Sequence, residues 1–150
     1  MSSGQQSPSP AVAAAIKQIR IQTGVVKRLV KEVRMYQTES ASLLAELEQL
    51  KVKQVSSSSA SEEAEHRLRK RQEVLRESQM MVPDTERRLS TAKERLDSLL
   101  QQHKGLCDSD PVYLEAVEEL KKLSGNDEAA SADASAGKAA ELPQKEAGDC

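Results

Sequence analysis

Two long stretches of the sequence place apolar residues at alternating three- and four-residue steps, and this heptad spacing restricts the fold more than any other feature. The first stretch, residues 11–53, has no proline and one glycine, Gly24, which a helix tolerates at a cost of about 1 kcal/mol. The spacing therefore predicts a helix over 11–53. Two overlapping apolar tracks run along it: Val12, Ile16, Ile19, Thr23, Val26, Val30 and Val33, then Val26, Leu29, Val33, Tyr36, Ser40, Leu43, Leu47 and Leu50. A face this wide suits a bundle of at least three helices better than a two-stranded zipper.

A second helix is predicted over 61–103, after a serine-rich turn at 56–61 that reverses the chain. Ser61 is a suitable N-cap, and the acidic residues that follow it are stabilised by the positive end of the helix dipole. Its seam is Ala64, Leu68, Arg71, Leu75, Ser78, Val82, Thr85, Leu89, Ala92, Leu96 and Leu99. The seam keeps its phase through Pro83, which favours one kinked helix, although a clean break before the proline is the alternative.

A third, shorter helix is predicted over 111–124. Gly105 is a candidate C-cap for the second helix, and Asp110 followed by Pro111 is a typical helix start. Residues 1–10 are expected to form a flexible tail. Residues 125–150 are rich in Ala, Ser, Gly and acids, and we expect an acidic disordered tail there.

Aromatic residues are almost absent from the 150-residue chain, which contains only Tyr36 and Tyr113. Compact cores that contain β-sheet normally bury several aromatic and β-branched side chains, so this composition argues against them. The expected fold is all-α: an antiparallel three-helix bundle, shaped as a coiled-coil-like rod, with two long helices and a shorter third over 11–124, the middle helix being kinked near Pro83.

Catalytic, metal and membrane functions are not favoured by the sequence. The only histidines, His66 and His103, lie roughly 55 Å apart along one predicted helix, so they cannot share a site. Cys107 and Cys150 make no disulfide framework, and no nucleotide- or metal-binding motif occurs. No apolar run of about 18 residues and no signal peptide is present. We therefore expect a cytoplasmic protein that is not an enzyme and needs no cofactor.

Basic residues concentrate in the first predicted helix, where only Glu32 opposes them: Lys17, Arg20, Lys27, Arg28, Lys31 and Arg34. Nucleic-acid binding is the first possibility, but no stacking aromatics are interleaved with the basic residues and the whole chain is slightly acidic. An acidic protein surface is the better partner for this helix.

Four apolar residues point away from the predicted seams: Ile21, Val25, Met35 and, on the second helix, Met80. Isolated surface apolar residues are common, and the third helix or the kink could also cover these. The functional interpretation is a partner-binding face with an apolar centre and a basic rim. Its candidate residues are Arg20, Ile21, Val25, Lys27, Arg28, Lys31, Arg34, Met35 and Met80.

Two sequence blocks resemble a known family. QIRIQTGVVKRLVKE at 18–32, followed by Met35 and Tyr36, is similar to the first helix of the tubulin-binding cofactor A family. EVLRESQMMVPD at 73–84, continuing through Arg87, Arg88 and Leu89, resembles its second helix. The run Tyr113-Leu114-Glu115-Ala116 is similar to part of the third, so that the resemblance covers roughly 12–124.

The resemblance implies a small three-helix chaperone that captures β-tubulin released from the cytosolic chaperonin. It would hold the subunit until the α/β heterodimer assembles, without nucleotide or metal. Other tubulin-folding cofactors are further expected partners, the location is cytoplasmic and associated with the cytoskeleton, and the chain is a monomer or homodimer. The alternative is a homo-oligomeric coiled-coil scaffold, and a nucleic-acid binder is the distant third.

Overall fold

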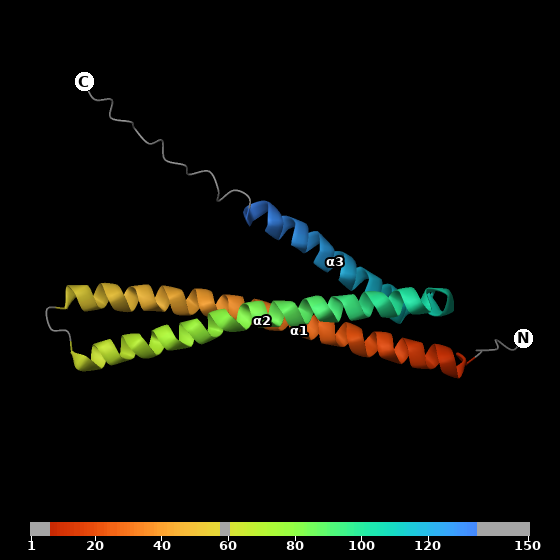
Figure 1. Cartoon of the computed structure of the whole chain (residues 1–150), viewed down its shortest axis with the longest axis horizontal. Coiled ribbons are helices and arrows are strands. Elements are labelled where there is room, and N and C mark those ends of the chain that lie inside the picture. The colour runs from red at the N-terminus through yellow and green to blue at the C-terminus, as the bar shows by residue number, and fades with distance from the viewer. Residues whose placement is uncertain (1–6, 58–60, 135–150) are drawn as a thin grey trace, which may run out of the picture.

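A computed structural model describes residues 7–57 and 61–134, with side chains described as far as residue 125. It contains three α-helices in this range and no strand: α1 (Pro10–Ser56), α2 (Glu62–Cys107) and α3 (Pro111–Ala134). Figure 1 shows α1 and α2 as a long antiparallel hairpin, with α3 running back beside the end at which α2 finishes. The expected all-α, antiparallel three-helix fold is confirmed.

The second and third helices start at the capping residues that the sequence suggests, Ser61 and Asp110, and α1 starts at Ser9, which was not predicted as a cap. Ser9 accepts a hydrogen bond from the amide of Val12 at 3.4 Å, and Pro10 occupies the first position of α1. Ser61 accepts from the amide of Glu63 at 3.2 Å at the start of α2. At α3, Asp110 accepts from the amide of Val112 at 2.8 Å. Each cap pairs an amide that has no partner within its own helix.

The expected C-cap at Gly105 is wrong, because α2 continues through this residue to Cys107. None of the glycines in the described part of the chain has a positive φ, so Gly105 does not adopt the left-handed conformation of a cap. The extra turn carries Cys107 into the core, where the residue is only 5% exposed. Burial of that side chain against α3 offsets the modest helix penalty of glycine.

The expected end of the third helix at 124 is also wrong. The helix α3 extends ten residues further, to Ala134, through part of the segment expected to be disordered. Alanine is the best helix former, and the repeated alanines after Gly125 explain the extension. The remainder of the predicted acidic tail, residues 135–150, lies outside the described residues, as do residues 1–6 of the predicted N-terminal tail.

Pro83 lies inside α2, which passes through it as a single helix. Proline has no amide hydrogen, so the carbonyl of Gln79 loses its usual partner in the helix. Two residues later, the hydroxyl of Thr85 donates to the carbonyl of Met81 at 2.8 Å, a bond that often accompanies bending. In Figure 1 the two halves of α2 run in slightly different directions. The clean break before Pro83 is therefore excluded.

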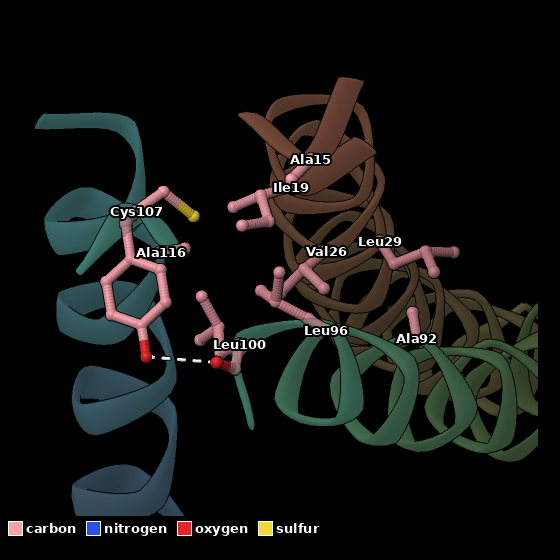
Figure 2. Packing of buried hydrophobic residues seen from close by; sticks show 10 residues of the cluster. Ala15, Ile19, Val26, Leu29, Ala92, Leu96, Leu100, Cys107 and Ala116 are labelled. Carbon is pink, nitrogen blue, oxygen red and sulfur yellow. Dashed lines mark hydrogen bonds between the residues drawn. The ribbon is translucent and has the colours of Figure 1, made fainter. Parts of the chain in front are cut away.

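The main core lies where all three helices meet. Figure 2 shows residues of α1, among them Ile19 and Val26, facing Leu96 on α2, with Cys107 and Ala116 on the side of α3. Ile19, Val26, Leu96 and Ala116 are fully buried. Ten buried residues form this cluster: Ala15, Ile19, Val26, Leu29, Ala92, Leu96, Leu100, Cys107, Tyr113 and Ala116. The predicted seams of both long helices thus supply half of this cluster, whereas Ala15 and Leu100 are buried although they lie outside the seams.

Tyr113 fixes the position of α3 on the hairpin. Its ring is 7% exposed, and its hydroxyl donates to the main-chain carbonyl of Leu100 at 3.0 Å, the bond drawn in Figure 2. Burial raises the pKa of the Tyr113 hydroxyl and that of the Cys107 thiol, so both stay protonated at neutral pH. The far half of the hairpin has only a small separate core of Leu43, Leu47 and Leu75.

Candidate partner-binding surface

Four of the predicted basic residues lie along the side of α1 that borders α3. Arg20, Lys27 and Arg34 follow one another at seven-residue steps, and Lys31 is one turn beyond Lys27, so they share a strip of the helix. Lys27 forms an ion pair with Glu115 of α3, which places this strip beside the third helix. Arg20, Lys31 and Arg34 are exposed there.

The pair of Lys27 and Glu115 holds α1 and α3 together through charge. The hydrogen bond to Glu115 raises the pKa of Lys27. The same bond, helped by the charge of Lys27 and by those of Arg20 and Lys122, lowers the pKa of Glu115. Both groups are therefore charged at neutral pH. Lys27, a predicted residue of the partner-binding face, is thus already paired within the chain before any partner binds.

The predicted apolar residues of α1 lie next to this strip, together with Arg28. Lys31 is one turn from both Arg28 and Met35, and Lys31, Arg34 and Met35 line a common hollow. Ile21, Val25, Arg28 and Met35 follow at steps of four, three and seven residues, and so form a second strip. Ile21 is 58% exposed and Met35 is 53% exposed. Val25 differs from them, because it is half-buried and packs against the main core. The expectation that it points outward is therefore only partly correct.

Met80 of α2 lies within about one helical turn of the level of Met35 of α1, although 45 residues separate them in the sequence. Two cross-links bracket them: Glu32 pairs with Arg88 at 3.9 Å, and the hydroxyls of Ser40 and Ser78 are 3.0 Å apart. Met80 is 67% exposed. The fold therefore brings the predicted α2 contact residue close to the end of the predicted apolar strip of α1.

A groove between α1 and α2 lies at the centre of this second strip. Val25, Leu29 and Ala92 are its apolar lining, and its volume is about 460 Å³. Four arginines line it as well: Arg28 from α1, and Arg87, Arg88 and Arg95 from α2. We call this the arginine groove. It continues along the same helices into a second hollow lined by Gln22, Thr91, Glu94, Arg95, Ser98, Leu99 and Gln102.

The acidic residues near the arginine groove only partly neutralise it. Arg87 pairs with Asp84 at 3.4 Å, while Arg28 and Arg88 share Glu32 at 4.0 and 3.9 Å. The three arginine side chains remain between 56% and 75% exposed. Such pairs at a surface contribute 0 to about 1 kcal/mol, so a partner's carboxylates can compete with them.

Arg87, Arg88 and Arg95 were not among the sequence-predicted site residues. In the sequence of α2 alone, these arginines belong to the charged, solvent-exposed face that most amphipathic helices have. Their significance depends on the register of α2 against α1, which puts them opposite Arg28. A basic seven-residue step from Arg88 to Arg95 is the only signal in the sequence itself.

The described residues form neither a metal cluster nor a membrane-spanning helix. In residues 7–57 and 61–125, no three His, Cys, Asp or Glu side chains gather in a way that could hold a metal ion. None of the described helices is both long and apolar enough to cross a bilayer. His66 is exposed, and His103 is half-buried with a buried Nε2 atom that has no hydrogen-bond partner among the described groups.

Comparison with known proteins gives a consistent result. A family model described as "Tubulin binding cofactor A" matches residues 14–120. The tubulin-specific chaperone A of Bos taurus is 40% identical over 101 residues, covering 67% of this chain and 85% of the relative. The chain belongs to the tubulin binding cofactor A family. The Homo sapiens protein of the same name is 38% identical over the same shares, and the tubulin-folding cofactor A of Arabidopsis thaliana is 32% identical over 109 residues, which is 73% of this chain and 87% of that relative.

The similarity extends to three dimensions. A solved structure named human tubulin chaperone cofactor A superposes with a TM-score of 0.58 and 35% sequence identity, covering 73% of this chain and 98% of that one. The cofactor A match at 14–120 contains both strips of α1, the arginine groove and the first ten residues of α3. The family resemblance expected from the two sequence blocks is confirmed.

Proposed function

We propose that this chain is a non-catalytic tubulin chaperone that binds β-tubulin. In this proposal it captures the subunit released from the cytosolic chaperonin and holds it until the α/β heterodimer assembles. In this proposal the chain acts in the cytoplasm, in association with the cytoskeleton. Other tubulin-folding cofactors are further proposed partners. The observation that carries the proposal is the cofactor A match across 14–120, whose relatives are named as tubulin-specific chaperones.

The surface of the rod supports an action by binding alone. Ile21, Met35 and Met80 expose apolar side chains on the same two helices that form the groove with the cationic rim. Apolar contacts flanked by arginine are typical of protein interfaces. A subunit that exposes unassembled surface tends to aggregate, and covering that surface needs no chemical step. Binding energy at the helix faces would therefore be sufficient for function.

Analytical size-exclusion chromatography tests the proposal. The full chain is mixed with β-tubulin subunits in the presence of EDTA and without added nucleotide, and α-tubulin subunits serve as the matched control. We expect the chain to co-elute with β-tubulin as a discrete complex, and to co-elute much less with α-tubulin. Failure to form a complex with β-tubulin at low salt would overturn the proposal.

A homo-oligomeric scaffold is the second candidate function, and one observation favours it. The far half of the hairpin, which α3 does not cover, exposes Val52 by 65%, Val55 by 88% and Val74 by 41%. Such residues could join a second copy. Mass measurement across a dilution series separates the candidates: a tight dimer that ignores tubulin supports the scaffold, whereas a monomer or dimer that binds β-tubulin supports the chaperone.

A further inference from the structure

The arginine groove carries more positive charge than the fold itself uses. Its lining contains four arginines and one aspartate, a formal charge of +3, which falls to +2 when the neighbouring Glu32 is included. Within the described part of the chain, Arg95 makes no ion pair. Arginines that remain exposed around an apolar floor keep their forked donors free for external carboxylates.

The spacing of the arginines indicates the form of the ligand. Arg88 and Arg95 are seven residues apart on one face of α2, which is about 10.5 Å along the axis. In the extended polyproline II conformation, with three residues per turn and a rise of about 3.1 Å per residue, carboxylates three residues apart lie on the same side of the chain and about 9 Å apart, which the flexible arginine side chains can span. Arg28, on the opposite wall, adds a third cationic contact between them. The half-buried Val25 offers an apolar contact at the floor.

We propose that the arginine groove binds an extended acidic segment of the captured polypeptide, with carboxylates three residues apart on Arg88 and Arg95. An apolar side chain of the segment lies against Val25. This inference rests on the proposed function, because it assigns the segment to the bound tubulin subunit. It moves the main electrostatic contact from the predicted strip beside α3, which contains Arg20 and Lys31, to the neighbouring strip of α1 that contains Arg28 and borders α2.

The groove fits carboxylates better than the phosphates of a nucleic acid. No aromatic side chain lines it, so unpaired bases have no stacking platform. Asp84 and Glu32 lie among the arginines and would repel a continuous line of phosphates. Carboxylates that are spaced along a peptide can contact the arginines without lying beside these two acidic residues. An acidic protein segment is therefore the occupant that the charge pattern favours.

The test measures fluorescence anisotropy of a labelled decapeptide made of glutamates with one central leucine, titrated with the full-length chain. A decapeptide with glutamine in place of every glutamate is the peptide control, and a labelled oligo-dT decamer probes nucleic acid. The groove variant is Arg88→Gln/Arg95→Gln. The matched control, Arg67→Gln/Lys70→Gln, removes the same charge from exposed positions of the same helix, away from the groove.

We expect the wild-type chain to bind the glutamate peptide, and the groove variant to bind it about tenfold more weakly. The control variant should stay close to wild type, and thermal unfolding followed by circular dichroism should be the same for all three. Equal losses in both variants, undetectable peptide binding, or tighter binding of oligo-dT would each overturn the inference.

Co-elution of the same proteins with β-tubulin separates this inference from the proposed function. If the wild-type chain binds β-tubulin but not the acidic peptide, the groove assignment fails and the chaperone function stands. If it binds the peptide but never β-tubulin, both the proposed function and the assignment of the segment to tubulin fail.

Discussion

The side-chain amide of Gln22 on α1 donates a hydrogen bond to the main-chain carbonyl of Ala92 on α2 at 3.1 Å. These residues are 70 positions apart in the sequence, and both line the arginine groove. Because this bond joins a side chain of α1 to one particular carbonyl of α2, it specifies the register of the two helices more strictly than apolar packing does. It places Arg28 across from the arginines of α2.

Replacing Gln22 with alanine should lower the free energy of unfolding by about 1 kcal/mol, the usual net value of one such hydrogen bond. Gln18→Ala, one turn earlier and exposed, is the matched control and should change it by less than about 0.5 kcal/mol. Urea unfolding measures both. Equal stability of the two variants would show that the bond does not hold the register.

Gly24→Ala should stabilise α1 by roughly 0.5–1 kcal/mol, because alanine is the better helix former. A methyl group at this position meets nothing within 4 Å in the free chain. Gly24 lies one turn from both Ile21 and Arg28 on the outward side of α1. Binding of β-tubulin by the variant, measured beside its unfolding, reports whether a partner approaches this backbone closely. A lower free energy of unfolding for Gly24→Ala would contradict the finding that the space around Gly24 is open.

The ion pair of Lys27 and Glu115 predicts a pH dependence for the attachment of α3. The pKa of Glu115 is lowered below its ordinary value of 4.5, so its contribution is present above that pH. The contribution disappears as the pH falls through the lowered value, because the unfolded chain then binds more protons than the folded one. A carboxyl carbon NMR titration of Glu115 should therefore show a midpoint below 4.5.

Lys27→Met should move that midpoint upward, toward the ordinary value. Lys121→Met removes a charge from an exposed site on α3 and serves as the control, with a smaller expected effect. A Glu115 titration that is the same in both variants and in the wild type would mean that the pair does not form in solution.

Pro83→Ala should raise the free energy of unfolding by about 1–3 kcal/mol, because a proline inside a helix removes one hydrogen bond and clashes with the carbonyl of the preceding turn. Pro83 is exposed, so little packing is lost with its ring. Ser90→Ala, an exposed position further along α2, is the control and should have a smaller effect. Destabilisation by Pro83→Ala would indicate that the core requires the bend.

The helices and their buried faces were predictable because heptad spacing depends only on local sequence. Ile19, Val26 and Leu96, all in the predicted seams, are completely buried. The positions of helix ends were less predictable. Gly105 resembles a cap, but the burial of Cys107 outweighs it, and α3 continues into an alanine-rich segment with no strong stop signal.

The candidate site was only partly predictable for a different reason. Ile21, Met35 and Met80 are exposed as expected, because helix periodicity determines which residues face outward. The division of the basic residues of α1 between the strip beside α3 and the strip beside α2 depends on where these two helices lie. The contribution of Arg87, Arg88 and Arg95 depends on the register of α2. Neither relation is contained in the periodicity of a single helix.

Hydrogen–deuterium exchange of the complex with β-tubulin tests the central claim most directly, that the chain holds tubulin through the arginine groove. The account predicts that binding slows exchange mainly in peptides covering 21–35 and 80–95, and that Arg88→Gln/Arg95→Gln reduces this protection. Protection confined to α3 or to the far end of the hairpin, with these two segments unchanged, would contradict it.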